Sequence, residues 1–266
     1  MVNLIEIKTV QSAAFRVLIE ALKEILTDAN FEFDETGIKI IAMDSSHTVL
    51  VHLKLNSENF EKFECKSKRI LGVNMLNLFK LIKTMGNNDS LTLFLDDDNE
   101  SVLCIRIENS EKNSITNYKL NLMDLHEDNI QIPPATFDSV ITIPSVDFQK
   151  ICRDMHNLAD DIEIKSVGSQ LIFNCKGEFA SQETCIGEAN SGMTFIQNQN
   201  PDEIVQGLFA LKHLVLFSKC TNLCNTVTLY IKNDYPLVIK YSVAALGEIK
   251  LCLSPNKPKD SYEYLS

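Results

Sequence analysis

Apolar residues recur every three to four positions in four segments of the chain, the spacing that is typical of amphipathic helices. We place these helices at residues 11–26, 74–86, 144–158 and 209–221. The first has the most regular pattern, and the last is apolar nearly all round, which leaves only a narrow polar stripe.

Between these helices the apolar residues fall in short runs bounded by turn residues, which is typical of strands in antiparallel meanders. A polar-apolar alternation at the N-terminus indicates a strand rather than a signal peptide. The predicted strands are 1–8, 31–33, 38–43, 48–55, 62–66, 91–95, 102–107, 117–122, 162–165, 170–174, 183–189, 227–231, 238–242 and 248–253.

The order of elements repeats, although the two halves share little residue identity. Strand, helix, strands, helix and strands occupy residues 1–122, and much the same order occupies 136–254. An acidic stretch between them ends in Pro133-Pro134, which cannot continue a helix or sit in a central strand. We therefore expect an α+β protein of two similar domains of antiparallel sheets with two helices each. The predicted domain ranges are 1–120, a connector at 121–134, 135–255 and a flexible tail at 256–266.

Each predicted helix carries two basic residues on its polar side, at spacings of three or seven that share a face. The pairs are Arg16/Lys23, Lys80/Lys83, Lys150/Arg153 and Lys212/Lys219. The four helices hold eight Lys or Arg against four Asp or Glu, a net charge of +4, whereas the whole chain carries −11 and the remainder therefore −15. A solvated face explains any one pair, but the same sorting in four helices favours a polyanion-binding surface.

Catalytic and metal-binding signatures are scarce in this chain of 266 residues. No phosphate-binding loop, zinc-protease or nucleophile-elbow motif occurs, so an enzyme is a distant third hypothesis. Cys220 and Cys224 lack partner ligands for zinc, and the Asp96–Asp98 run indicates a solvated hairpin turn rather than a metal loop. No apolar run approaches the length that spans a bilayer, and eight scattered cysteines indicate a reducing compartment. We expect no cofactor and no membrane partner.

Several motifs resemble one family, the eukaryotic-type sliding clamp known as proliferating cell nuclear antigen. The resemblance extends from about Leu4 to Pro255 with few gaps. It rests on Met43-Asp44-Ser45-Ser46-His47, Leu71-Gly72-Val73-Asn74, the Leu120-x-Leu122-Met123-Asp124-Leu125 run with the following Ile132-Pro133, Phe148-x-x-Ile151-Cys152-Arg153-Asp154, and Asp234-x-Pro236-Leu237-Val238.

The resemblance implies a homotrimeric ring of two-domain subunits, with helices lining a hole around duplex DNA and sheets forming the outer wall. Such a ring tethers a DNA polymerase as a processivity factor, without regard to sequence, in the nucleus or in a viral replication compartment. Seven of the basic residues match positions that the family uses for DNA, namely Arg16, Lys23, Lys80, Lys83, Lys150, Arg153 and Lys219. Lys212 follows from the helix pattern alone.

The resemblance also implies a pocket beneath the connector for polymerase, clamp-loader and repair proteins that carry a Q-x-x-[ILM]-x-x-aromatic-aromatic motif. The matching residues are Met43, His47, Leu50, Ile130, Ile132, Pro133, Pro236 and Pro255. In the same way, the resemblance implies a subunit interface that joins the strand around Tyr118 to the segment Cys175–Ser181 of the next subunit. The predicted interface residues are Tyr118, Cys175, Lys176 and Glu178.

Three positions depart from the family pattern. The usual aromatic pair near the end of the last strand is Leu251-Cys252, the position of the ubiquitin-carrying lysine is Gly168 with Lys165 nearby, and an extra stretch occupies 109–116. These departures indicate a divergent clamp, from a protist or a DNA virus. Two alternatives remain open: a checkpoint-type clamp subunit that works only in a mixed ring, and a non-ring adaptor or monomeric processivity factor.

Overall fold

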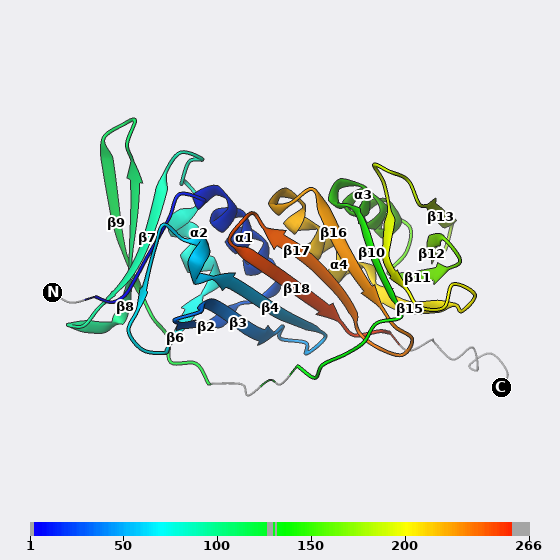
Figure 1. Cartoon of the computed structure of the whole chain (residues 1–266), viewed down its shortest axis with the longest axis horizontal. Coiled ribbons are helices and arrows are strands. Elements are labelled where there is room, and N and C mark those ends of the chain that lie inside the picture. The colour runs from blue at the N-terminus through cyan, green and yellow to red at the C-terminus, as the bar shows by residue number, and fades with distance from the viewer. Residues whose placement is uncertain (1–2, 127–129, 131, 257–266) are drawn as a thin grey trace. The chain divides into compact units, whose positions relative to one another are not determined.

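The computed structural model describes residues 3–126, 130 and 132–256. Its contacts divide the chain into two units, the first comprising Met1–Pro133, Asn222–Cys224 and Lys240–Leu251, and the second the remaining residues. Strands β17 (Leu237–Val243) and β18 (Gly247–Leu253) contribute residues to both units. In its described residues, each unit contains two α-helices and antiparallel sheets (Figure 1). The α+β prediction of two similar halves is confirmed.

The first unit holds α1 (Ser12–Ile25) and α2 (Met75–Ile82), which pack against each other. The apolar face of α1 is buried through side chains such as Phe15, Leu18 and Leu22, as its 3.6-residue periodicity predicts. Helix α2 begins where Asn74 accepts a 2.9 Å hydrogen bond from the backbone N–H of Asn77. Such a cap satisfies one of the backbone donors that the first turn of a helix leaves unpaired.

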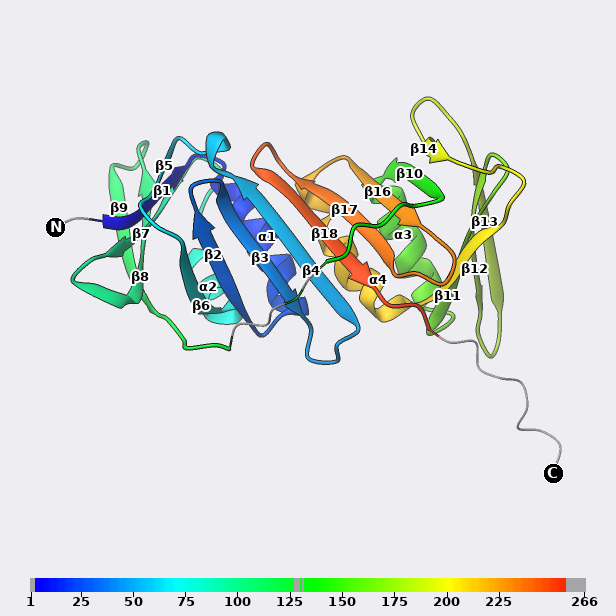
Figure 2. The ribbon, with the colours of Figure 1, turned by 60° about the horizontal axis from the view of Figure 1, so that its bottom comes forward.

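Two antiparallel groups of strands complete the first unit. One has the order β5-β1-β7-β8-β9, so β9 is an edge strand, and the other has the order β4-β3-β2-β6. Helix α1 lies behind the second group in Figure 2. The bounds are β1 Asn3–Thr9, β2 Asp28–Asp34, β3 Gly37–Met43, β4 Val49–Asn56, β5 Lys62–Cys65, β6 Arg69–Asn74, β7 Ser90–Asp96, β8 Asn99–Asn109 and β9 Ser114–Asn121, with a 3-10 turn at Ser57–Asn59.

The second unit repeats this plan. Helices α3 (Ser145–His156) and α4 (Leu211–Phe217) pack against each other, and α3 contacts β10 and β16. The strands group as β14-β10-β16 and as β13-β12-β11-β15, so β13 is an edge strand. The bounds are β10 Ser139–Pro144, β11 Asp161–Val167, β12 Gln170–Lys176, β13 Ser181–Gly187, β14 Thr194–Asn198, β15 Val205–Ala210 and β16 Thr226–Ile231, with a 3-10 segment at Ser218–Leu223.

Three strands, β6, β14 and β15, are absent from the sequence prediction. Strand β15 runs directly into α4, so Phe209 and Ala210, predicted as helix, instead pair with Ile162 and Asp161 of β11. No turn residue marks this junction, and an apolar run that crosses it has no period to divide it. Helix α4 also ends earlier than predicted, at Phe217, because the chain tightens there into a 3-10 segment.

Candidate DNA-facing and docking surfaces

In the first unit, the basic residues lie on and beside the two packed helices. Lys80 and Lys83 are exposed, whereas Arg16 and Lys23 are half-buried. The Lys23 ammonium lies 4.9 Å from the centre of the Phe79 ring of α2 and pairs with the neighbouring carboxylate of Glu24. A cation held over a ring remains charged. The α1 and α2 basic residues therefore belong to one continuous face.

In the second unit, Lys150 and Arg153 are exposed on α3, and Lys212 is exposed on α4. Lys150 pairs with Asp154 one turn later, and this carboxylate raises the pKa of the lysine. Lys219 is also exposed but lies in the 3-10 segment, so the α-helical spacing assumed for Lys212 and Lys219 ends between them. That one prediction of a shared helical face is wrong for a local backbone reason.

The Met43–His47 motif forms a tight loop between β3 and β4 that is organised by one carboxylate. Asp44 Oδ1 accepts hydrogen bonds from the backbone N–H groups of Thr48 and Val49, at 2.8 and 2.7 Å. Burial raises the pKa of Asp44, but these bonds and those from Ser46 outweigh it, so its pKa is lowered. The loop holds His47 exposed with a φ of 54°.

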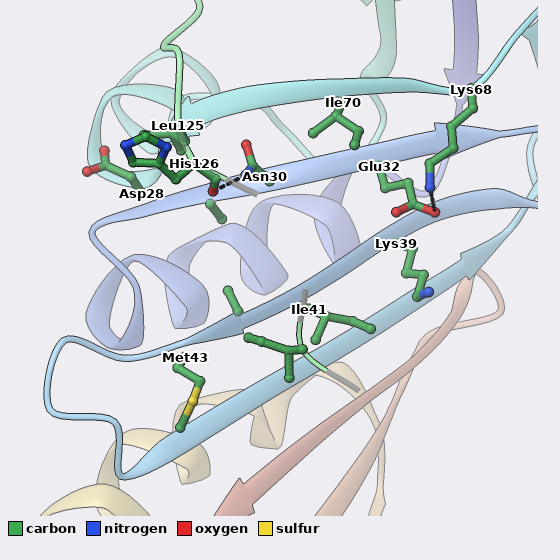
Figure 3. A pocket seen from close by; sticks show the side chains of 13 residues that line it. Asp28, Asn30, Glu32, Lys39, Ile41, Met43, Lys68, Ile70, Leu125 and His126 are labelled. Atoms are coloured by element: carbon green, nitrogen blue, oxygen red, sulfur yellow. Dashed lines mark hydrogen bonds and ion pairs between the residues drawn. The ribbon is translucent and has the colours of Figure 1, made fainter. Parts of the chain in front are cut away.

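A pocket of about 570 Å³ opens on the strand face beside this loop (Figure 3). Of the eight predicted docking residues, only Met43 and Ile130 line it. The complete lining is Asp28, Ala29, Asn30, Glu32, Lys39, Ile41, Ala42, Met43, Lys68, Ile70, Leu125, His126 and Ile130.

The remaining predicted docking residues lie outside that lining. Leu50 is the cross-strand neighbour of Met43, and Ile132 is 41% exposed in the connector beside Pro133. Pro236 and Pro255 are half-buried in the second unit. The sequence analysis did not predict the roles of Ile41 and Ile70 as lining residues. Their signal was an apolar side chain at an outward-facing strand position.

The start of the connector is held against the first unit. The Met123 backbone N–H donates to the Gly72 carbonyl of β6 at 2.9 Å, and the Asn30 side-chain amide of β2 donates to the His126 carbonyl at 3.0 Å. These bonds place Leu125 and His126 over the strand face, where they form one wall of the pocket. Residues 127–129 and 131 of the predicted connector, and the predicted tail at 257–266, lie outside the described residues.

Each unit presents one edge strand that matches the predicted subunit interface in part. Tyr118 lies on β9, the edge of its sheet. Cys175 and Lys176 lie on β12, which pairs on one side with β11 and on the other with β13. The Cys175 side chain is buried and its strand has no open side, so the prediction that it takes part in strand pairing is wrong. The edge in this region is β13, and Glu178 lies in the turn before it.

The candidate metal residues form no site. The acidic run caps the β7–β8 hairpin, where Asp96 pairs with Asn99 and accepts a 3.3 Å bond from the Asp98 backbone. Among the described residues, no group of three or more His, Cys, Asp or Glu side chains is arranged to hold a metal ion. Within the same part of the chain, no helix has the length and apolar content required to cross a bilayer.

These features define a two-unit clamp architecture, and comparison with known proteins agrees with it. The family model for the proliferating cell nuclear antigen N-terminal domain matches residues 4–130, and that for its C-terminal domain matches residues 131–256. The chain therefore belongs to the proliferating cell nuclear antigen family, whose members are non-enzymatic processivity factors of DNA replication.

A curated relative has a similar sequence along nearly its whole length. It is the "Probable DNA polymerase sliding clamp 1" of Paramecium bursaria Chlorella virus 1. The two sequences are 37% identical over 256 residues, which is 95% of this chain and 97% of the relative.

Proposed function

We propose that this protein is a DNA sliding clamp, a homotrimeric ring that encircles duplex DNA and tethers a DNA polymerase to its template. The observation that carries the proposal is the position of the eight basic residues. They lie on α1 to α4 and the adjoining turns of a chain whose net charge is −11. Family membership supports the same function.

The proposed mechanism is electrostatic and topological. Phosphate groups attract Lys and Arg without regard to base sequence, so the basic faces bind duplex DNA with no preferred register. Flexible lysine contacts exchange from phosphate to phosphate, which lets the ring follow the duplex. Closure of the ring retains the clamp on DNA, and the tether raises the local concentration of the bound polymerase.

For the ring itself we propose pairing of β9 from one subunit with β13 of the next. Both are edge strands, which carry backbone N–H and C=O groups able to pair with another chain. The contact joins two different surfaces, so it propagates head to tail and closes when the rotation permits. The exposed side chains of Ile115 on β9 and Phe179 in the turn before β13 add apolar area to these edges.

The second proposed activity is the docking of polymerase, clamp-loader and repair proteins that carry the Q-x-x-[ILM]-x-x-aromatic-aromatic motif. Its apolar and aromatic anchors would contact the eight docking residues named from the sequence, with the connector at 121–134 as one wall. Such a protein would act where DNA is replicated, in the nucleus or in a viral replication compartment.

Solution mass tests the ring. We expect light scattering of the purified chain at micromolar concentration to give a homotrimer, and Tyr118→Ala to shift it toward the monomer. Ile196→Ala is the matched control, since Ile196 is 64% exposed on β14, outside the proposed interface. A wild-type monomer would contradict the homotrimer, and trimer formation only after mixing with paralogous chains would instead identify a mixed-ring subunit.

A further inference from the structure

The outward face of the strands in the first unit carries a cluster of basic residues unrelated to the four helices. Side chains alternate along β3 and β4, and the register places Lys39 directly opposite Lys54 and Ile41 opposite His52. Like charges opposite each other on adjacent strands destabilise a sheet. Neither lysine has an ion pair with another described residue, so folding gains nothing evident from placing them together.

Two further lysines extend this cluster. Lys250 and Lys240 contact the single acidic member, Glu248, at 3.0 and 3.7 Å between nitrogen and carboxylate oxygen. Burial lowers the pKa of His52 and so do Lys250, Lys39 and Lys54, which favours the neutral imidazole at pH 7. The four lysines and one glutamate therefore give this basic patch (Lys39, Lys54, Lys240, Glu248 and Lys250) a net charge of +3.

The basic patch continues into the 570 Å³ pocket, because Lys39 belongs to both. Along β3 the outward residues are Lys39, Ile41 and Met43, and all three line the pocket. Figure 3 shows them in sequence along this strand, with α1 behind it. Four residues of strand span roughly 13 Å, so a cationic end and an apolar end lie about that far apart on one surface.

We propose that this surface docks an extended peptide segment of a partner protein, in which acidic residues lie about four positions from apolar ones. The apolar side chains would contact Ile41, Ile70 and Leu125 in the pocket, and the carboxylates would pair with Lys39, Lys54 and Lys250. Charge complementarity selects this occupant: an anion relieves the repulsion within the basic patch. The inference goes beyond the proposed clamp function and does not require that the ring close.

A peptide fits this surface better than a nucleic acid does. The pocket also carries Asp28 and Glu32 on β2. Glu32 pairs with Lys68 at 3.1 Å and so cancels that lysine's charge. A continuous phosphate backbone that followed the surface from Lys39 along β2 would meet both carboxylates, whereas a peptide carries negative charge only where its sequence places it.

The experiment measures fluorescence anisotropy of a labelled synthetic peptide that has two leucines followed, four positions later, by two glutamates. The titrants are the full-length chain, Lys39→Ala/Lys54→Ala, and the control Lys66→Ala/Lys112→Ala, which removes two exposed lysines elsewhere in the first unit. Two exposed ion pairs lead us to expect about 3- to 10-fold weaker binding by the patch variant and none by the control. Added salt should weaken wild type more than the patch variant.

Three results would overturn the proposal. The first is no wild-type binding at peptide concentrations up to about 1 mM, the weak limit of specific recognition. The second is equal binding of the glutamate peptide and a matched glutamine peptide. The third is that Lys39→Ala/Lys54→Ala weakens binding of a labelled single-stranded or duplex oligonucleotide but leaves peptide binding intact, which would identify a nucleic-acid surface. Ile41→Ala tests the apolar half: its loss should weaken the leucine peptide but not one with alanines.

Discussion

Gly72 of β6 and Met123 of the connector approach so closely that only glycine fits at position 72. The Met123 N–H donates to the Gly72 carbonyl at 2.9 Å, and a Cβ atom added to Gly72 would lie 2.2 Å from the Met123 carbonyl oxygen. That oxygen belongs to the backbone and cannot rotate away. The Leu71-Gly72-Val73-Asn74 motif thus has a physical role: it lets the connector begin against the strand edge.

We expect Gly72→Ala to displace the start of the connector, because the added methyl group and the Met123 carbonyl cannot share the space. Overpacking of this kind costs about 1–3 kcal/mol in the free energy of unfolding. Hydrogen exchange should show lost protection at the Met123 amide. Gly187→Ala is the control, since a Cβ there meets no atom within 4 Å. Unchanged protection at Met123 in the Gly72 variant would contradict this reading.

The basic helix faces provide a second prediction. Replacing four exposed residues with alanine should leave folding and assembly intact, since their side chains point away from the apolar helix faces, but should reduce clamp loading and polymerase stimulation. The residues are Lys80, Lys83, Lys150 and Arg153. The loss should steepen as salt rises, because fewer phosphate contacts remain to resist screening. Activity equal to wild type across a salt series would remove these helices from the proposed DNA side.

A third prediction concerns the connector. Ile132 is 41% exposed, so it is available to a docking peptide. Truncation of a buried anchor costs about 1–3 kcal/mol, so Ile132→Ala should weaken a motif peptide roughly 5- to 150-fold in calorimetric titration, with the ring unchanged. Cys252→Tyr is the converse variant and should tighten binding by restoring the aromatic residue of the family pattern. Equal binding by wild type and Ile132→Ala would place the docking site elsewhere.

A fourth prediction follows from His52. Its pKa is lowered in the folded protein by burial and by Lys250, Lys39 and Lys54, with Glu248 acting in the opposite direction. The unfolded chain, with a histidine pKa of about 6.5, therefore takes up a proton first as the pH falls. The free energy of unfolding should decrease as the pH drops below about 6.5 and on toward the folded-state pKa.

Thermal unfolding of His52→Gln checks this sign. The variant keeps a polar side chain but cannot titrate, so its melting temperature should fall less than that of wild type between pH 7 and 5.5. The control is His126→Gln, at an exposed position outside the basic patch. Parallel pH profiles for wild type and His52→Gln would show that the lysines around His52 do not influence its proton affinity.

The helices and most strands were predictable because their signals are local. The 3.6-residue periodicity of α1 and the polar-apolar alternation of β3 are visible within a dozen residues. Strand β6 was missed because Gly72 interrupts its apolar run, and β15 because Phe209 continues without a turn into α4. The basic residues of the proposed DNA face were likewise identified from their own helices, apart from the change at Ser218 that separates Lys219 from α4.

The sequence by itself determined the two α+β halves, the segregation of basic charge onto helices and the connector that ends in two prolines. Tertiary structure decided which strands are edges, so that β13 rather than Cys175 has an open side. It also decided which side chains are neighbours across strands, as Lys39 and Lys54 are. Strand order and register arise from pairing between segments distant in the chain, and a shift of one residue would turn Lys39 to the opposite face. No local pattern carries that information.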